Sequence, residues 1–181
     1  YMINASDAGY DKFGSSVATY GGDTVIVGAP YRPNGGQVYG YEINTTHSFE
    51  RIILHPSQLG GSDLYGYSVD FSNYFFIAGG APSHDFPQLN NGAVFTFTFN
   101  FTHWNPEPRI NVNDSNASSG TDFGFSAAVF GKKKYIKKKS KLKFLFFLWN
   151  IQGTTAIFGA PNAQFISGDV GAAYVYSYNS G

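Results

Sequence analysis

The sequence predicts an all-β protein, a partial β-propeller of about three four-stranded antiparallel blades. Three observations predict it. One motif occurs three times in the 181 residues, with starts 52 and 58 residues apart. Each copy is followed by a segment in which large residues alternate with small or polar ones. Aromatic residues make up 18% of the chain and 22 residues are glycine, a composition that suits pleated strands joined by tight turns.

The motif opens with aromatic-Gly, has Ser three residues after the aromatic, and closes with Gly-Ala-Pro. The first two copies are FGSSVATYGGDTVIVGAP at 13–30 and YGYSVDFSNYFFIAGGAP at 65–82. The third begins with FGFSAAVFG at 123 and resumes with GTTAIFGAP at 153, ending at 161. We assign a structural role to the motif residues Phe13, Gly14, Gly28, Ala29, Pro30, Tyr65, Gly66, Gly80, Ala81, Pro82, Phe123, Gly124, Gly159, Ala160 and Pro161.

Each unit predicts several strands in order. The pair Gly21-Gly22 before Asp23 is a hairpin signal between two strands, and VIVGAP is the continuous apolar run of a strand buried on both faces. The third strand is GQVYGYE at 36–42, GAVFTFTF at 92–99 and GAAYVYSY at 171–178, where period two indicates one packed face. A fourth run follows at 49–54 and at 109–112. The predicted blade units are about 11–56, 63–112 and 121–181 of one partial propeller, 1–181.

These residues resemble the FG-GAP repeat family, whose units carry an FG-x-S-V-A opening, a G-D-T-x-V-V-G-A-P centre and a G-x-V-Y-V-Y strand. The first copy matches nearly throughout, whereas the second departs at Tyr65 and at Asn73-Tyr74, and the third at Thr154. The resemblance implies a propeller like that of integrin α-chain heads and of many microbial and protist surface proteins, usually of seven blades. Three blades do not close a propeller, so we expect a fragment of a longer protein or a truncated gene model.

Residues 132–152, KKKYIKKKSKLKFLFFLWNIQ, interrupt the third copy, and deleting them aligns that copy with the first without a gap. The segment holds 8 of the 12 basic residues, so the rest of the chain has a net charge of −8. Translated intron is the favoured interpretation, because the codons of these residues are rich in A and T. A basic nucleic-acid or nuclear-targeting patch, a membrane anchor that is too short to span, and an extended hairpin loop are the alternatives. If the segment is present in the mature protein, we expect an exposed β-hairpin extension with no specific ligand.

Motifs for catalysis and for metal binding are missing from the sequence. None of His47, His55, His84 and His103 has a zinc-binding spacing, and there is no cysteine, G-x-S-x-G or P-loop. We therefore expect no enzyme and no cofactor, and a solvated role for each histidine. Integrin-type calcium loops of the form D-x-D-x-D-G are also missing. We interpret Asp11, Asp63 and Asp122 as turn or cap residues, and the polar group Asn111, Asn113 and Asp114 lacks the glycine pattern, so no metal is predicted.

Five Asn-x-Ser/Thr sequons, which only the secretory pathway can use, favour a cell-surface or secreted glycoprotein whose signal and anchor lie outside this sequence. They are Asn4, Asn44, Asn100, Asn113 and Asn116. The acidic balance without 132–152 argues against nucleic acid, and the aromatic residues fall on strands, which favours packing between blades over a stacking platform. We expect any membrane attachment to come only from flanking segments.

The loops that differ most between the units are 31–35, 83–91 and 162–169, and we expect a protein or glycan ligand to bind there. The leading functional hypothesis is a non-catalytic binding or adhesion module. The alternatives are an accessory propeller of a larger secreted enzyme, of phospholipase or hydrolase type, and a purely structural surface repeat.

Overall fold

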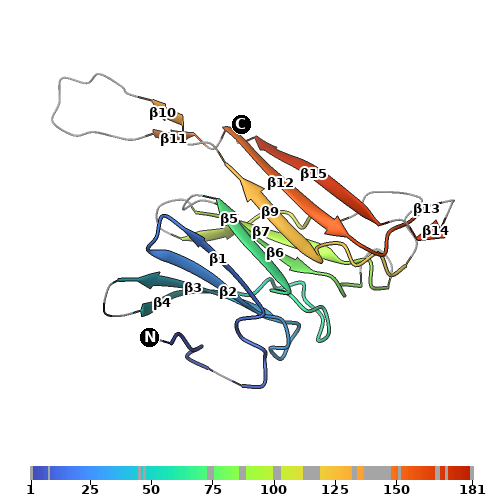
Figure 1. Ribbon diagram of the computed structural model, residues 1–181, viewed down its shortest axis with the longest axis horizontal. Coiled ribbons are helices and arrows are strands. Elements are labelled where there is room, and N and C mark those ends of the chain that lie inside the picture. Colours follow the sequence, from blue (N-terminus) through green and yellow to red (C-terminus); the bar gives the residue numbers. More distant parts are fainter. Residues whose placement is uncertain are drawn as a thin grey trace.

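Three antiparallel β-sheets stand side by side in the computed structural model (Figure 1). The structure describes residues 2–7, 9–44, 46, 48–72, 76–85, 89–99, 103–111, 119–131, 134–136, 148–150, 152–165, 168–169 and 171–179. Every regular element in this part of the chain is a strand. The prediction of an all-β partial propeller is therefore confirmed.

The first two sheets have four strands each, joined in chain order. The first sheet contains β1 (Ser16–Tyr20), β2 (Thr24–Ala29), β3 (Gln37–Ile43) and β4 (Ser48–Leu54). The second contains β5 (Ser68–Ser72), β6 (Phe76–Ala81), β7 (Ala93–Phe99) and β8 (Trp104–Pro106). Corresponding strands pair in the same register, since Ser16 lies opposite Gly28 and Ser68 opposite Gly80. Each hairpin thus holds the serine of the motif against its closing glycine.

The third sheet has three strands in the described part of the chain. They are β9 (Ser126–Phe130), β12 (Gln152–Ala160) and β15 (Ala172–Asn179), and Ser126 lies opposite Gly159 in the register of the other sheets. A small hairpin of β13 (Gln164–Phe165) and β14 (Gly168–Asp169) lies between β12 and β15. β15 is an edge of the sheet in this part of the structure.

The fourth strand of the second unit was predicted at 109–112, and this prediction is wrong. β8 ends at Pro106, and among the described residues beyond it the Glu107 N–H donates to Thr96 O at 2.9 Å and Ile110 forms an isolated bridge to Val94. Proline has no backbone N–H, so Pro106 and Pro108 interrupt the ladder between the two places. The bridge at Ile110 matches the first sheet, where Leu54 pairs with Val38 at the same register.

The anomalous segment carries a short hairpin of β10 (Lys134–Ile136) and β11 (Leu148–Asn150), which lies beyond the ends of β9 and β12 (Figure 1). Residues 137–147 lie outside the described residues. The register of β12 against β15 shifts between Gln152 and Thr154, where the repeat motif resumes after the insertion. The origin of the segment as translated intron stays a prediction.

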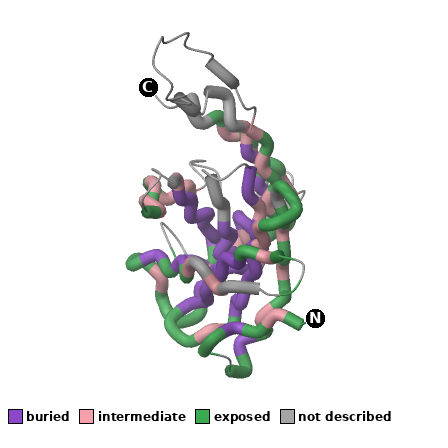
Figure 2. The backbone as a smooth tube through the Cα atoms, turned by 90° about the vertical axis from the view of Figure 1, so that its left-hand side faces the viewer, coloured by how far each residue is buried: buried purple, intermediate pink, exposed green. Residues whose placement is uncertain are grey.

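Two apolar cores lie between successive sheets, where Figure 2 shows the buried residues gathered. The core between the first and second sheets contains Ile26, Val38, Leu54, Tyr65, Val69, Phe71, Ala81, Ala93, Phe95 and Phe97. The core between the second and third contains Val94, Phe123, Ala156, Phe158, Ala160 and Ala163. A third cluster, of Ala5, Val27, Ala29, Tyr39 and Tyr41, lies on the other face of the first sheet. Burial of apolar area between sheets is the main stabilising term of such an architecture.

The aromatic that opens each motif has equivalent surroundings in the three sheets. In each unit the opening aromatic (Phe13, Tyr65 or Phe123) contacts a second aromatic residue. This partner lies three residues after the glycine that precedes the third strand. The ring pairs are edge-to-face, with centroid distances of 5.4 Å to Tyr39, 5.7 Å to Phe95 and 5.4 Å to Tyr174. Tyr65 and Phe123 are fully buried, whereas Phe13 is half-buried. The aromatic residues of the motif are thus core residues.

Glycine and serine of the motif set the distance between sheets. Ser16 Oγ donates to the carbonyl oxygen of Gly66 in the next sheet at 2.7 Å, and Ser68 Oγ donates to that of Gly124 at 2.7 Å. A Cβ on Gly28 would lie 2.0 Å from the Gly66 oxygen, and one on Gly80 would lie 1.9 Å from the Gly124 oxygen. Since no side chain fits, these positions require glycine so that the carbonyl of the next sheet can approach.

Substituting Gly80→Ala should lower the free energy of unfolding by about 2–3 kcal/mol, because the second and third sheets must separate to admit the methyl group. The matched control is Gly159→Ala at the same motif position. The nearest atoms to its Cβ all belong to Ser126, first the Oγ at 2.3 Å, which can rotate away. We expect that control to cost less than about 1 kcal/mol. Urea unfolding in dilute solution measures both, and equal losses would contradict the assigned role of Gly80.

Candidate functional site

The turn before each motif aromatic is where the candidate polar residues gather. Lys12, Leu64 and Asp122 precede the three aromatics, and all have positive φ, between 53° and 61°. Asp11, Asp63 and Thr121 are therefore the equivalent residues one position earlier. Asp122, which the sequence analysis grouped with Asp11 and Asp63, belongs instead to the following position. The third unit has Thr121 where the other two units have Asp11 and Asp63, and for this reason the sequence analysis grouped Asp122 with them.

Each of these turns ties the chain to the loop after Gly-Ala-Pro. The backbone N–H of Tyr31 donates to Asp11 O at 3.1 Å, and that of Ser83 donates to Asp63 O at 3.3 Å. Thr121 Oγ1 donates instead to Asn91 O at 2.6 Å, and Asn162 Nδ2 donates to Asp122 Oδ2 at 2.6 Å. The aromatic-Gly turns and the described parts of the three loops, residues 31–35, 83–85, 89–91 and 162–165, thus lie at one end of the sheets.

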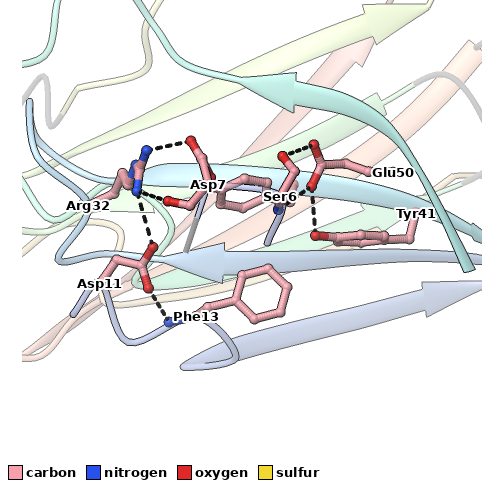
Figure 3. Close-up of polar contacts among 8 residues, drawn as sticks. Ser6, Asp7, Asp11, Phe13, Arg32, Tyr41 and Glu50 are labelled. Carbon is pink, nitrogen blue, oxygen red and sulfur yellow. Dashed lines mark hydrogen bonds and ion pairs between the residues drawn. The ribbon is translucent and has the colours of Figure 1, made fainter. Parts of the chain in front are cut away.

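Asp11 forms the first of these clusters, together with the N-terminal segment (Figure 3). Its Oδ1 accepts the Phe13 N–H at 3.2 Å, and its Oδ2 lies 3.7 Å from Arg32 Nη1. Arg32 also forms an ion pair with Asp7, whose Oδ1 accepts the Tyr39 hydroxyl at 2.7 Å. Burial and this bond to Asp7 raise the pKa of Tyr39. Asp11 acts here as a turn residue that also orients Arg32.

The second cluster is buried and contains a histidine. His84 Nδ1 lies 2.5 Å from Asp63 Oδ2, and Arg109 Nη1 lies 2.8 Å from His84 Nε2. Arginine can only donate, so Nε2 accepts and Nδ1 carries the proton that is donated to Asp63. Both ring nitrogens are therefore engaged, and His84 has no lone pair left to take a proton from a substrate. The cluster is suited to holding the Arg109 guanidinium in place.

The prediction of a solvated role is wrong for His84, which is 5% exposed, with its ring edge-to-face against Phe95 at 5.5 Å. Its burial follows from its loop position, because it occupies the place of Arg32 in the first unit and of Ala163 in the third. The backbone N–H of each of these three residues donates to the alanine carbonyl of its Gly-Ala-Pro. His55 and His103 are exposed, and His47 lies outside the described residues.

A groove of about 1000 Å³ lies between the first and second sheets, along β4 and β8. Its walls are residues 52–58 on the first unit and, on the second, Phe95, Phe97, His103, Trp104 and residues 106–109. The walls are mainly apolar and aromatic, with Arg109 as a fixed cation and Glu107 as an anion whose carboxylate accepts the Thr98 hydroxyl. Desolvation lowers the pKa of Arg109, and the nearby Asp63 carboxylate opposes that shift. Apolar walls with a few placed polar groups are typical of ligand sites.

Two of the loops expected to bind a ligand border this groove. His55, in the groove wall, contacts Asn34 O of the first loop through Nε2 at 3.1 Å. Arg109, in the opposite wall, contacts His84 of the second loop. Loop 162–169 lies on the third unit, away from the groove. The sequence analysis missed the groove because its walls come from two units, and no repeat position identifies it.

The remaining polar candidates do not gather into a site. Among the described residues, no three His, Asp or Glu side chains lie close enough together to hold a metal ion. Asn111 O accepts the Tyr176 hydroxyl at 3.2 Å, while Asn113 and Asp114 lie outside the described residues. The expectation of no metal therefore stays a prediction, as does that of no cofactor.

Two of the five sequons can be placed. Asn4 and Asn44 are exposed, and Asn44 Oδ1 accepts the backbone N–H of Thr46 at 2.9 Å. Asn100, Asn113 and Asn116 lie outside the described residues. The described part of the chain contains no helix with the length and hydrophobicity that a membrane crossing requires.

Comparison with known proteins identifies the repeat. The family model for the FG-GAP repeat matches residues 2–41. This match covers the first copy of the motif through Gly-Ala-Pro and most of β3. No curated protein matches the chain. FG-GAP repeats are typically non-catalytic propeller modules, and they occur in extracellular or cell-surface proteins.

Substituting His84→Ala should lower the free energy of unfolding by about 2 kcal/mol, because the buried Asp63 carboxylate loses a hydrogen-bond donor. His55→Ala is the matched control, since that ring is exposed, and we expect no measurable change. Thermal or urea unfolding at neutral pH compares the two. A His84→Ala protein as stable as the His55→Ala protein would show that the Asp63–His84–Arg109 cluster does not stabilise the fold.

Proposed function

We propose that this chain, an FG-GAP repeat protein, is a non-catalytic binding module of a cell-surface or secreted protein, and that it binds a protein ligand through an extended peptide segment. The groove between β4 and β8 carries the proposal. It is the place where apolar walls, a held guanidinium and two of the variable loops meet.

The shape and chemistry of the groove favour an extended peptide with an acidic side chain. Its walls run along the edge strands β4 and β8, against which an extended backbone can lie. Trp104 and Ile52, both half-buried, offer apolar contact, and aromatic residues are the usual anchors of protein interfaces. Arg109 gives the groove wall a local positive charge, which favours a ligand with a carboxylate. Its position is fixed by His84, so less side-chain entropy is lost on binding.

Outside 132–152 the chain has more acidic than basic residues, and this favours a peptide over a polyanion as the ligand. Outside 132–152 the net charge is −8, which repels a polyanion, whereas one local cation is enough to orient a single carboxylate. Adhesion, attachment to a membrane and the glycoprotein character belong to this proposal as the expected setting of the module.

The test is selection of peptides from a displayed random library on the immobilised chain, followed by affinity measurement of the enriched peptides. We expect sequences that combine apolar residues with Asp or Glu, and at least about tenfold weaker binding to the Ile52→Lys protein, since Ile52 is half-buried in the groove wall on the face of β4 toward the second sheet. Val175→Lys is the matched control, because Val175 is an exposed strand residue of the third sheet, away from the groove.

Three results would contradict the proposal. The first is that no peptide is enriched above background, and the second is that enriched peptides bind the Ile52→Lys protein as tightly as the unchanged protein. The third is specific binding on a glycan array where the peptides give none. Arg109→Gln serves as a second variant, which should weaken binding of acidic peptides more than that of neutral ones. Circular dichroism and unfolding of each variant separate loss of the groove from loss of the fold.

A further inference from the structure

Asn44 lies at the tip of the hairpin that joins β3 to β4. β3 ends at Ile43 and β4 begins at Ser48, and these two residues lie opposite each other. Asn44 and Thr46, both in the connection, are exposed. They are the first and third residues of an Asn-x-Thr sequon whose middle residue, Thr45, is not proline. A bulky group bonded to Asn44 therefore extends into solvent and displaces no strand residue.

The two side chains that define this sequon are bonded to each other. Asn44 Oδ1 accepts the backbone N–H of Thr46 at 2.9 Å and the Thr46 hydroxyl at 3.1 Å. Both bonds span only two residues, so this turn can form locally, before the rest of the unit folds. A hydrogen bond to the oxygen of a carboxamide makes its N–H more acidic, and Nδ2 is the atom to which an N-linked glycan is bonded. The hydroxyl of the sequon thus acts on the amide that is modified.

The other sequon in the described part of the chain is arranged differently. Its third residue, Ser6, donates both its backbone N–H and its hydroxyl to the Glu50 carboxylate, at 3.2 and 2.8 Å. Asn4 O accepts the Tyr41 hydroxyl at 3.1 Å, so the backbone of this segment is tied to the first sheet. Of these two sequons, it is therefore the one at Asn44 that directs its hydroxyl to its own asparagine.

The second unit repeats the sequon at the same position. Asn44 comes eight residues after Gly36, the glycine that precedes the third strand. Asn100 comes eight residues after the equivalent Gly92, and both asparagines have threonine two residues later. Asn100 lies outside the described residues, so this equivalence is one of sequence. A tight turn needs the asparagine and a backbone N–H, whereas the sequon also needs the threonine that recurs here.

Asn44 and the recognition loops lie at opposite ends of the first sheet. At the loop end, Gln37 lies opposite Ala29 of Gly-Ala-Pro. At the other end, the Ile43 N–H donates at 2.6 Å to Asp23 O, in the turn between β1 and β2. The seven residues of β3 separate the two ends by about 20 Å. A glycan on Asn44 is therefore compatible with ligand binding at the loop end.

The wall that the first unit contributes to the groove also lies toward the loop end. Leu54, in that wall, lies opposite Val38, near the start of β3. The seven residues of β4 separate Leu54 from Ser48, beside Asn44, by about 20 Å. Modification of Asn44 therefore leaves this wall open to a peptide and surrounds the opposite end of the sheet with carbohydrate.

We propose that Asn44 carries an N-linked glycan. The modification rests on the proposed function, in its setting of a cell-surface or secreted protein, because only the secretory pathway supplies the donor, an oligosaccharide linked to a lipid diphosphate. Nδ2 of Asn44 forms a bond to C1 of the first sugar, and the bond between C1 and the diphosphate oxygen breaks. The lipid diphosphate leaves with that electron pair, and the Nδ2 proton passes to a base of the transferase. Thr46 is a positioning residue, since its hydroxyl donates to Oδ1.

The test is secretion of the 181-residue chain from cultured eukaryotic cells behind an added cleavable signal sequence, followed by measurement of peptide masses. Peptide N-glycosidase releases the glycan and leaves aspartate in place of the glycosylated asparagine, so it identifies the position. We expect the peptide that contains residue 44 to carry a glycan, and to contain aspartate at position 44 after release. An unmodified mass for that peptide overturns the proposal.

Two substitutions of Thr46 test the sequon while Asn44 stays unchanged. Thr46→Ala removes the hydroxyl and should abolish the glycan at position 44, whereas Thr46→Ser keeps a hydroxyl and should retain it. Asn4→Gln is the matched control, because it removes the other described sequon and should leave the glycan at position 44 in place. A glycan at position 44 that persists in the Thr46→Ala protein overturns the proposal.

Translation of the same chains in the presence of microsomal membranes gives the same readout without a folded or secreted product. A variant that fails to fold is therefore still informative. The added signal supplies the secretory route, so an unmodified Asn44 overturns the glycan and leaves the proposed peptide binding untouched. Failure of the peptide selection, in turn, overturns the proposed ligand and leaves the glycan at Asn44 untouched.

Discussion

The serine hydroxyl that donates to a glycine carbonyl of the next sheet fixes how closely two successive sheets approach. Ser16 and Ser68 make this bond at 2.7 Å, and it exists only because Gly28 and Gly80, opposite these serines, have no side chain. The short approach brings the faces of the sheets into apolar contact. The position of the aromatic rings, the Asp-centred turns and the groove between β4 and β8 all follow from that spacing.

The same constraint explains what could be predicted from the sequence. A glycine, a serine and an aromatic at fixed spacing indicate the repeat, because each has one permitted role at the contact between sheets. Alternation in the third strands then places Tyr39, Phe95 and Tyr174 correctly. Prediction failed where one unit departs from the others, as with Pro106 and Pro108 in the fourth strand and Thr121 in the third turn. Alignment of residue types between the repeats cannot show such a change of role.

The candidate site was only partly predictable, for a related reason. The loops after Gly-Ala-Pro were identified by their variability, and two of them do border the groove. The groove itself, and the burial of His84 between Asp63 and Arg109, depend on residues that are 21 and 25 positions apart in the chain. The groove follows from the stacking of two units, whereas the contacts of His84 join distant parts of the second unit, and local periodicity carries no information about either. The repeated framework thus determines the shape of the groove, and the non-repeated residues determine its chemistry.

Three serines at one motif position provide the most direct measurement of the central claim. Ser16 and Ser68 donate to the next sheet, whereas Ser126 lies on the outer face of the third sheet and is exposed. The account predicts that Ser16→Ala and Ser68→Ala each lower the free energy of unfolding by about 1 kcal/mol or more in dilute solution, while Ser126→Ala leaves it unchanged. Equal effects of the three substitutions would contradict it, since the hydroxyl would then act within its own sheet.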